Sequence, residues 1–169
     1  MAQVDRNSNV IANIVATPPT VNKPSDGSAS RLFEVAGLVT PAADDSSGSI
    51  HRFVRVPSNA RISEVLFSTA DASTAGAINI GVYQTAANGS AVVDADLFAS
   101  ALDLSGGPFY NSDQTYESGE YTFAESVKPL WEVLGLTADP CREYDIAATI
   151  STTYNGAGTT QLLKVRYVI

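Results

Sequence analysis

From residue 31 onward, the chain consists largely of short segments in which apolar and polar residues alternate. Alternation with a period of two is typical of a β-strand that buries one face, and the Gly, Pro, Asn and Asp clusters between the segments are typical of turns. The alternation predicts strands over Ile50–Val56, Ile78–Tyr83, Tyr144–Ser151 and Leu163–Ile169, and the β-like composition and flanking turns predict strands over Leu32–Val39 and Arg61–Ala70. Within the second strand, it places His51 and Phe53 on the face opposite Ile50 and Val54.

Two turn clusters predict how four of these strands pair. The loop Asp71–Gly76 precedes the strand that begins at Ile78, and the loop Asn155–Gly158 separates the last two strands. Gly-containing loops between alternating segments are typical of β-hairpins. We therefore predict a hairpin across each loop. We also expect that removing residues 167–169 removes core contacts, because they belong to the last predicted strand.

Two segments depart from the alternation and predict short helices. In Asp94–Leu102, apolar residues recur at spacings of one, three and four, and Asp94 is a favoured N-cap residue. Pro129–Gly135 has proline at its start and glycine at its end, which are the residues favoured at those positions of a helix. The elements together predict an all-β antiparallel sandwich with one or two short helical insertions.

Residues 1–30 differ in character from the rest, with three prolines and one apolar patch. The patch is formed by Val10, Ile11, Ile14 and Val15. No basic segment precedes the patch, so we do not interpret it as a secretory signal. We interpret residues 1–30 as an extended N-terminal arm and residues 31–169 as the β-sandwich domain. Two fates stay open for the arm: it docks on a neighbouring subunit, or it is a loose terminus.

Between the two predicted helices, Ser105–Gly119 is rich in Gly, Pro, Asn and Ser and is predicted to be a long surface loop. The loop carries Phe109, Tyr110 and Tyr116. Aromatic residues in a polar loop are typical of contact surfaces, although they also anchor loops onto their own domain. These three residues are therefore candidate partner-binding residues, together with the arm patch.

Composition excludes several classes of function. The net charge is −8 with only three lysines, whereas binding to nucleic acid requires clustered basic residues. No apolar run approaches the length of a membrane span, so we expect a soluble protein that contacts neither nucleic acid nor membrane. One cysteine and one histidine leave no intrachain disulfide and no multi-histidine metal site. Charged residues are only 17% of the chain, which favours packing against other proteins.

Candidate chemistry is sparse. His51 occupies an ordinary strand position, and Cys141 has no adjacent histidine, so we predict neither an enzyme nor a catalytic residue. The spacing of Asp94 and Asp96 suits a divalent cation, but helix capping explains both carboxylates, and we predict no metal and no cofactor. Trp131 and the tyrosines could form a sugar-binding platform; for Trp131 we favour a place in the core.

A resemblance to a known group of proteins adds to this interpretation. It rests on four stretches in order, the last of which precedes Tyr144–Ile146: Phe53–Ile62, Asn79–Tyr83, Val93–Ala101 and Pro129–Leu136. Together they resemble the capsid decoration, or cement, proteins encoded in the virion gene clusters of tailed bacteriophages. The resemblance covers residues 50–169 and excludes the arm and the loop over residues 105–127.

The resemblance implies a jelly-roll-like sandwich that binds the outside of an icosahedral capsid and cements neighbouring major capsid subunits. It implies no enzyme activity and no cofactor, with the major capsid protein as partner and self-contact or homo-oligomerisation on the lattice. The chain would be made in the host cytoplasm and reside on the capsid exterior of the virion. Alternatives are a head-fibre, neck or tail component, or a carbohydrate-binding β-sandwich module.

Overall fold

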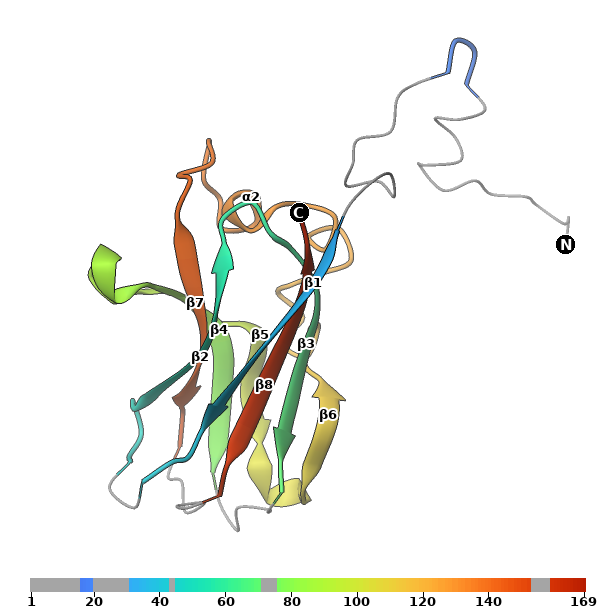
Figure 1. Cartoon of the computed structure of the whole chain (residues 1–169). Helices are drawn as coiled ribbons and strands as arrows, with labels where there is room; N and C mark the ends of the chain where they lie inside the picture. The colour runs from blue at the N-terminus through green and yellow to red at the C-terminus, as the bar shows by residue number, and fades with distance from the viewer. Residues whose placement is uncertain (1–15, 20–30, 43–44, 71–75, 153–158) are drawn as a thin grey trace, which may run out of the picture.

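The computed structural model describes residues 16–19, 31–42, 45–70, 76–152 and 159–169, and these form two four-stranded antiparallel sheets that pack face to face (Figure 1). Sheet A has the strand order β1-β8-β3-β6, and sheet B has the order β2-β7-β4-β5. The strands are β1 Leu32–Val39, β2 Ile50–Pro57, β3 Arg61–Thr69, β4 Ala77–Gln84, β5 Val92–Asp103, β6 Phe109–Asp113, β7 Glu143–Ile150 and β8 Gln161–Val168. The predicted all-β sandwich is confirmed.

The strand pairing defines a jelly roll. The first strand pairs with the eighth, the second with the seventh, the third with the sixth and the fourth with the fifth, all antiparallel. The chain is thus folded like one long hairpin that rolls up until β3 meets β8 and β4 meets β7. Both predicted hairpins are wrong, because β3 and β4 lie in opposite sheets, as do β7 and β8.

The core lies between the sheets, where the alternating residues of both inner faces meet. On β8, Leu163, Val165 and Tyr167 are buried, while the residues between them face outward. On β3, a bulge at Ser63 interrupts the pairing with β8, because Ile62 opposes Tyr167 and Glu64 opposes Arg166. Ser63 is therefore an extra residue of β3, close to the start of that strand.

On one side of the sandwich, β1 of sheet A and β2 of sheet B come close together, at a bulge on β2 and a glycine on β1. Arg52 opposes Ala147 and Val54 opposes Ile146, so Phe53 is an extra residue in the strand. The buried side changes across the bulge: His51 and Val54 are both buried, and the single inward face predicted for Ile50–Val56 is wrong. At Gly37, a Cβ would lie 2.0 Å from the carbonyl oxygen of Phe53, so only glycine permits this approach of β1 to β2.

The helix predicted over Asp94–Leu102 is wrong, because these residues belong to β5. Ile80 of β4 pairs with Ala99 of β5, and Val82 pairs with Asp94. A step of two residues along β4 is therefore matched by a longer step along β5, so β5 contains extra residues that pair with none on β4. Such irregularity destroys the period of two in the sequence and mimics helical spacing. Leu97, Phe98 and Ala99 are consecutively buried as a result, a pattern that a regular strand cannot produce.

The second predicted helix is confirmed as α2, Leu130–Val133, which lies at the end of the sandwich near the end of β8 (Figure 1). Gly135 follows it with φ of +73°, the left-handed conformation that glycine favours after a helix. Leu130 is buried, whereas Trp131 is only half-buried and lies outside the core cluster. The long loop predicted over Ser105–Gly119 contains the short edge strand β6 instead, so that expectation is corrected.

Two further 3-10 turns, η2 Ala86–Asn88 and η3 Leu104–Gly106, flank β5. In the part of the chain that the structure describes, no helix has the length and apolar character needed to cross a membrane.

Candidate functional site

The arm residues proposed for partner binding, Val10, Ile11, Ile14 and Val15, lie outside the described residues. The three aromatic candidates of the loop are placed, and they divide into different roles. Phe109 begins β6 and is partly buried, with its ring centroid 6.1 Å from that of Phe67. Tyr110, the next residue, is 72% exposed. Phe109 therefore anchors the edge strand, whereas the side chain of Tyr110 is exposed to solvent.

Tyr116 belongs to an aromatic cluster with Tyr121 and Phe123. Its ring stacks on Tyr121 at 6.0 Å and meets the edge of Phe123 at 4.9 Å. Tyr121 is buried, and its hydroxyl donates a hydrogen bond of 2.7 Å to the carbonyl oxygen of Ile62, directly before the β3 bulge. Burial raises the pKa of Tyr121 above its ordinary value. Phe123 is 78% exposed and forms the outer rim of the cluster.

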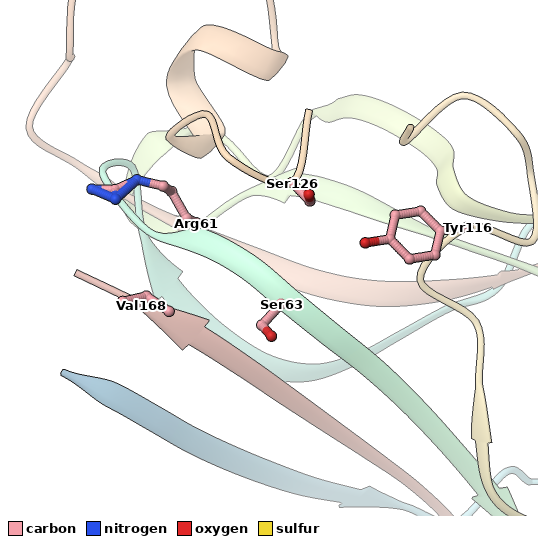
Figure 2. Close-up of a pocket in the computed structure, with 5 residues that line it drawn as sticks. All are labelled: Arg61, Ser63, Tyr116, Ser126 and Val168. Carbon is pink, nitrogen blue, oxygen red and sulfur yellow. The ribbon is translucent and has the colours of Figure 1, made fainter. Parts of the chain in front are cut away.

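A pocket of about 160 Å³ opens beside this cluster. It is lined by Arg61, Ser63, Tyr116, Ser126 and Val168. Figure 2 shows Arg61 at one end and Tyr116 at the other, with the two serines between them. Ser63 reaches the pocket because it is the bulged residue of β3, and Ser126 comes from the turn before α2, where its hydroxyl donates to the carbonyl oxygen of Phe123 at 2.8 Å.

Sequence reasoning named Tyr116 but missed the other pocket residues. Arg61 and Ser63 begin a strand, and Ser126 follows some sixty residues later, so no local pattern joins them. The sequence signal that could have indicated the aromatic cluster beside the pocket is the close spacing of Tyr116, Tyr121 and Phe123.

The outer face of sheet A is a second exposed surface. Arg166 on β8 forms ion pairs of 2.7 Å with Glu34 on β1 and 2.6 Å with Glu64 on β3, so one guanidinium joins three strands. The hydrogen bond from Arg166 lowers the pKa of Glu34. Exposed Leu32 and Leu38 flank this bridge along β1, and the latter is 69% exposed. An apolar, partly charge-neutralised face of this kind suits contact with another protein.

The structure brings Asp94 and Asp96 together with Glu120, with one carboxylate oxygen from each within 4.8 Å of the others. Helix capping cannot explain the two aspartates, since they lie on a strand. Asp94 instead accepts a hydrogen bond of 3.3 Å from the backbone N–H of Asp96, and Asp96 accepts one of 3.0 Å from the Ser100 hydroxyl. Donors within the chain account for both positions, and we assign no metal to the cluster.

His51 is buried, and its Nε2 lies 3.0 Å from a carboxylate oxygen of Asp45, a pair that sequence reasoning missed. Its Nδ1 has no hydrogen-bond partner among the described residues. Cys141 is exposed just before β7 begins, whereas His51 opposes Ala148 farther along that strand. The described residues therefore give His51 a carboxylate neighbour but no nucleophile in hydrogen-bond contact.

These features define an eight-stranded jelly roll with exposed aromatic and apolar surfaces. No family model and no curated protein matches the chain. Among solved structures, it is similar to a chain of "Cyanophage Pam1 capsid asymmetric unit", with a TM-score of 0.52 and 12% identity over 91% of this chain and 96% of that one. A looser likeness is to a chain of "Acidic stable capsid structure of Helicobacter pylori bacteriophage KHP30", with a TM-score of 0.42 and 10% identity over 83% and 93%. The first likeness shows a shared fold.

Proposed function

We propose that this protein is a virion structural protein that binds the outside of an icosahedral phage capsid and cements neighbouring major capsid subunits. The observation that carries the proposal is the likeness to the cyanophage Pam1 capsid chain, which spans nearly the whole of both chains. It agrees with the resemblance to capsid decoration proteins found in residues 50–169.

The surface of the sandwich supports the same proposal. Large apolar side chains are exposed on both β1 and the rim of the aromatic cluster, as at Leu38 and Phe123. Exposed apolar groups rimmed by polar residues are typical of interaction sites. The proposed partner is the major capsid protein, with self-contact between copies on the lattice, and the proposed role requires neither catalysis nor a cofactor.

A cement protein acts by mass action. If it binds the assembled shell and not the dissociated subunits, its binding free energy stabilises the shell. Many copies on one particle multiply the effect, and an arm that docks on a second subunit makes each attachment bivalent. The apolar patch that contains Ile11 and Ile14 is the segment proposed for that second contact.

Deleting residues 1–24 tests this proposal. We expect the variant to fold as the full chain does, since the sandwich begins at β1, and to lose binding to purified shells because one of the two contacts is gone. Co-sedimentation with shells measures occupancy, and circular dichroism with thermal unfolding monitors the fold. Unchanged occupancy by the shortened chain would contradict the role of the arm.

Copy number separates the proposed role from its alternatives. Quantitative mass spectrometry of purified particles should count hundreds of copies of this chain relative to the major capsid protein. A dozen copies or fewer would indicate a neck or tail component instead. Glycan binding that disappears in Tyr110→Ala or Trp131→Ala, without any shell binding, would indicate a carbohydrate-binding module.

A further inference from the structure

The outer face of β1, β8 and β3 is built from four rows of side chains that run across the strands. Residues that oppose one another in antiparallel strands point to the same side of a sheet, so the register defines each row. The residues of β8 that alternate with its buried ones point outward. In order along the strands, the rows are Leu38, Leu162 and Ser68; then Ala36, Lys164 and Leu66; then Glu34, Arg166 and Glu64; and finally Leu32 and Val168. Figure 1 shows these three strands side by side on the near side of the sandwich.

The charges on this face are arranged by row. Lys164 is the charged residue of the second row, here called the lysine row, and it forms no ion pair with the described residues. The third row, here called the arginine row, carries one net negative charge, because Arg166 lies between two glutamates at 2.7 and 2.6 Å. The order along the strands is therefore apolar, positive, negative, apolar.

The two outer rows are apolar and exposed. Leu38 in the first row is 69% exposed, and Leu32 in the last row is 66% exposed. Arg61 opposes Val168 at the β3 end of the last row, where it lines the pocket described above. The four rows together carry no net charge, although the chain as a whole carries −8. Two copies can bring this face together without the repulsion that their total charge imposes elsewhere.

The order of the rows is complementary to its own reverse. A two-fold axis that lies in the plane of the face and crosses the strands at Val165 places the lysine row of each copy over the arginine row of the other. The same rotation places Leu162 of one copy over Val168 of the other, so the apolar rows also meet. Opposite charges then face one another twice, as an isologous interface requires of a self-complementary patch.

We propose that this face binds a second copy of the same chain, with the two β8 strands antiparallel across a two-fold axis. Three strands of eight residues give a face of roughly 350 Å² per copy, less than half of the ~800 Å² that each partner contributes to a stable complex. The dimer of the free chain is therefore weak, with a Kd on the order of 0.1–1 mM. That copies held close together on a shell meet in this way rests on the proposed function.

The first test uses the full native chain. Sedimentation velocity from about 10 μM to about 1 mM should show a reversible equilibrium between monomer and dimer. In a mixture of differently labelled copies, methyl groups of Leu162 and Val168 should give an intermolecular nuclear Overhauser effect. These two residues lie about 20 Å apart along β8 of one chain, so no contact within a copy can produce this signal.

Charge reversal tests the pairing of the rows. Lys164→Glu places a negative charge over the negative arginine row, and Glu34→Lys makes the arginine row positive beneath the lysine row. Each variant alone should dimerise at least about tenfold more weakly than the native chain, because both row contacts become repulsive. An equimolar mixture of the two variants should dimerise again, since each altered row then meets its opposite. Recovery in the mixture also shows that both variants are folded.

Two comparisons separate this pairing from general effects of charge. Arg142→Glu makes the same change in charge as Lys164→Glu at an exposed residue outside sheet A, and it should leave the Kd unchanged within about twofold. Glu34→Lys brings the net charge of the chain closer to zero. Weaker dimerisation of that variant therefore cannot arise from overall repulsion between copies.

A native chain that stays monomeric up to about 1 mM would overturn the proposal. A mixture of the two variants that dimerises no better than either alone would also overturn it. Loss of the dimer on deletion of residues 1–24 would do the same, because the arm and not sheet A would then join the copies. Shell binding enters none of these measurements, so this proposal and the proposed function can fail separately.

Discussion

At the scale of single residues, Asp45 forms hydrogen bonds both to His51 at the start of β2 and to Ala42 in the segment before it. Its carboxylate accepts hydrogen bonds of 2.9 Å from the backbone N–H of Ala42 and 3.0 Å from the Nε2 of His51. These two bonds, the first more than the second, lower the pKa of Asp45 below its usual range. The folded state therefore holds the carboxylate in its charged form more strongly than the unfolded chain does.

This pKa shift predicts a pH dependence of stability. Because the folded-state pKa is depressed, the contribution of Asp45 is present above the unfolded pKa of about 3.9 and is lost as the pH falls through the lower folded value. Asp45→Asn should unfold at lower urea than the native chain at pH 7, and the difference should shrink to nothing in strong acid. Urea unfolding of both proteins from pH 7 down to strong acid measures this difference in stability.

The matched control is Glu132→Gln, which removes the same charge from an exposed side chain on α2. Its urea midpoint should follow that of the native chain at every pH. If Asp45→Asn behaved in the same way, the hydrogen bonds to this carboxylate would have no part in the stability of the fold.

At the scale of elements, the contact between β1 and β2 depends on one missing side chain. A Cβ on Gly37 would lie 2.0 Å from the carbonyl oxygen and 2.6 Å from the carbonyl carbon of Phe53, and backbone atoms cannot yield as a flexible side chain can. We expect Gly37→Ala to lower the free energy of unfolding by about 1–3 kcal/mol, the range of overpacked cores. Denaturant unfolding measures the loss.

Gly106→Ala is the control for this substitution, since a Cβ there meets nothing within 4 Å. It should change stability by no more than about 0.5 kcal/mol. Equal destabilisation by the two substitutions would contradict the role of the approach of β1 to β2, because the lower freedom of an alanine backbone in the unfolded chain favours folding.

Sequence reasoning found the elements far better than their partners. Alternation identified β8, which buries every second residue, and the β-type pattern also identified β1 and β4, although β1 has no buried residue and β4 is buried on both faces. A strand that crosses to the opposite sheet has the same alternating pattern as a hairpin strand, so the pattern did not identify the pairing partners. Where bulges interrupt the alternation, as in β5, the sequence pattern predicted a helix although the segment is a strand. The site was found only at Tyr116, since the pocket joins Arg61 to Ser126 through the fold and not through any local pattern.

At the scale of the whole molecule, β8 holds sheet A together, because it lies between β1 and β3. Tyr167 near its end is buried in the core and stacks on Phe33 at 5.4 Å. Removing residues 167–169 should lower the free energy of unfolding by about 3–5 kcal/mol, as loss of a buried aromatic side chain does. Denaturant unfolding with near-ultraviolet circular dichroism measures this.

Removal of Ile169 alone provides the comparison, because this residue is exposed and follows the last strand. Its loss should leave stability within about 0.5 kcal/mol of the full chain. Comparable destabilisation by the two truncations would show that the cost arises from shortening the chain and not from loss of the tyrosine.

The central place of β8 also sets an order of events during translation. Its neighbours β1 and β3 are synthesised long before it, and neither pairs with the other in sheet A. Sheet A therefore cannot be completed until residues 161–168 have left the ribosome, and a partial chain presents unpaired strand edges to the cytosol. Stalled or prematurely terminated chains should accordingly be captured by chaperones and proteases, so that only finished copies accumulate.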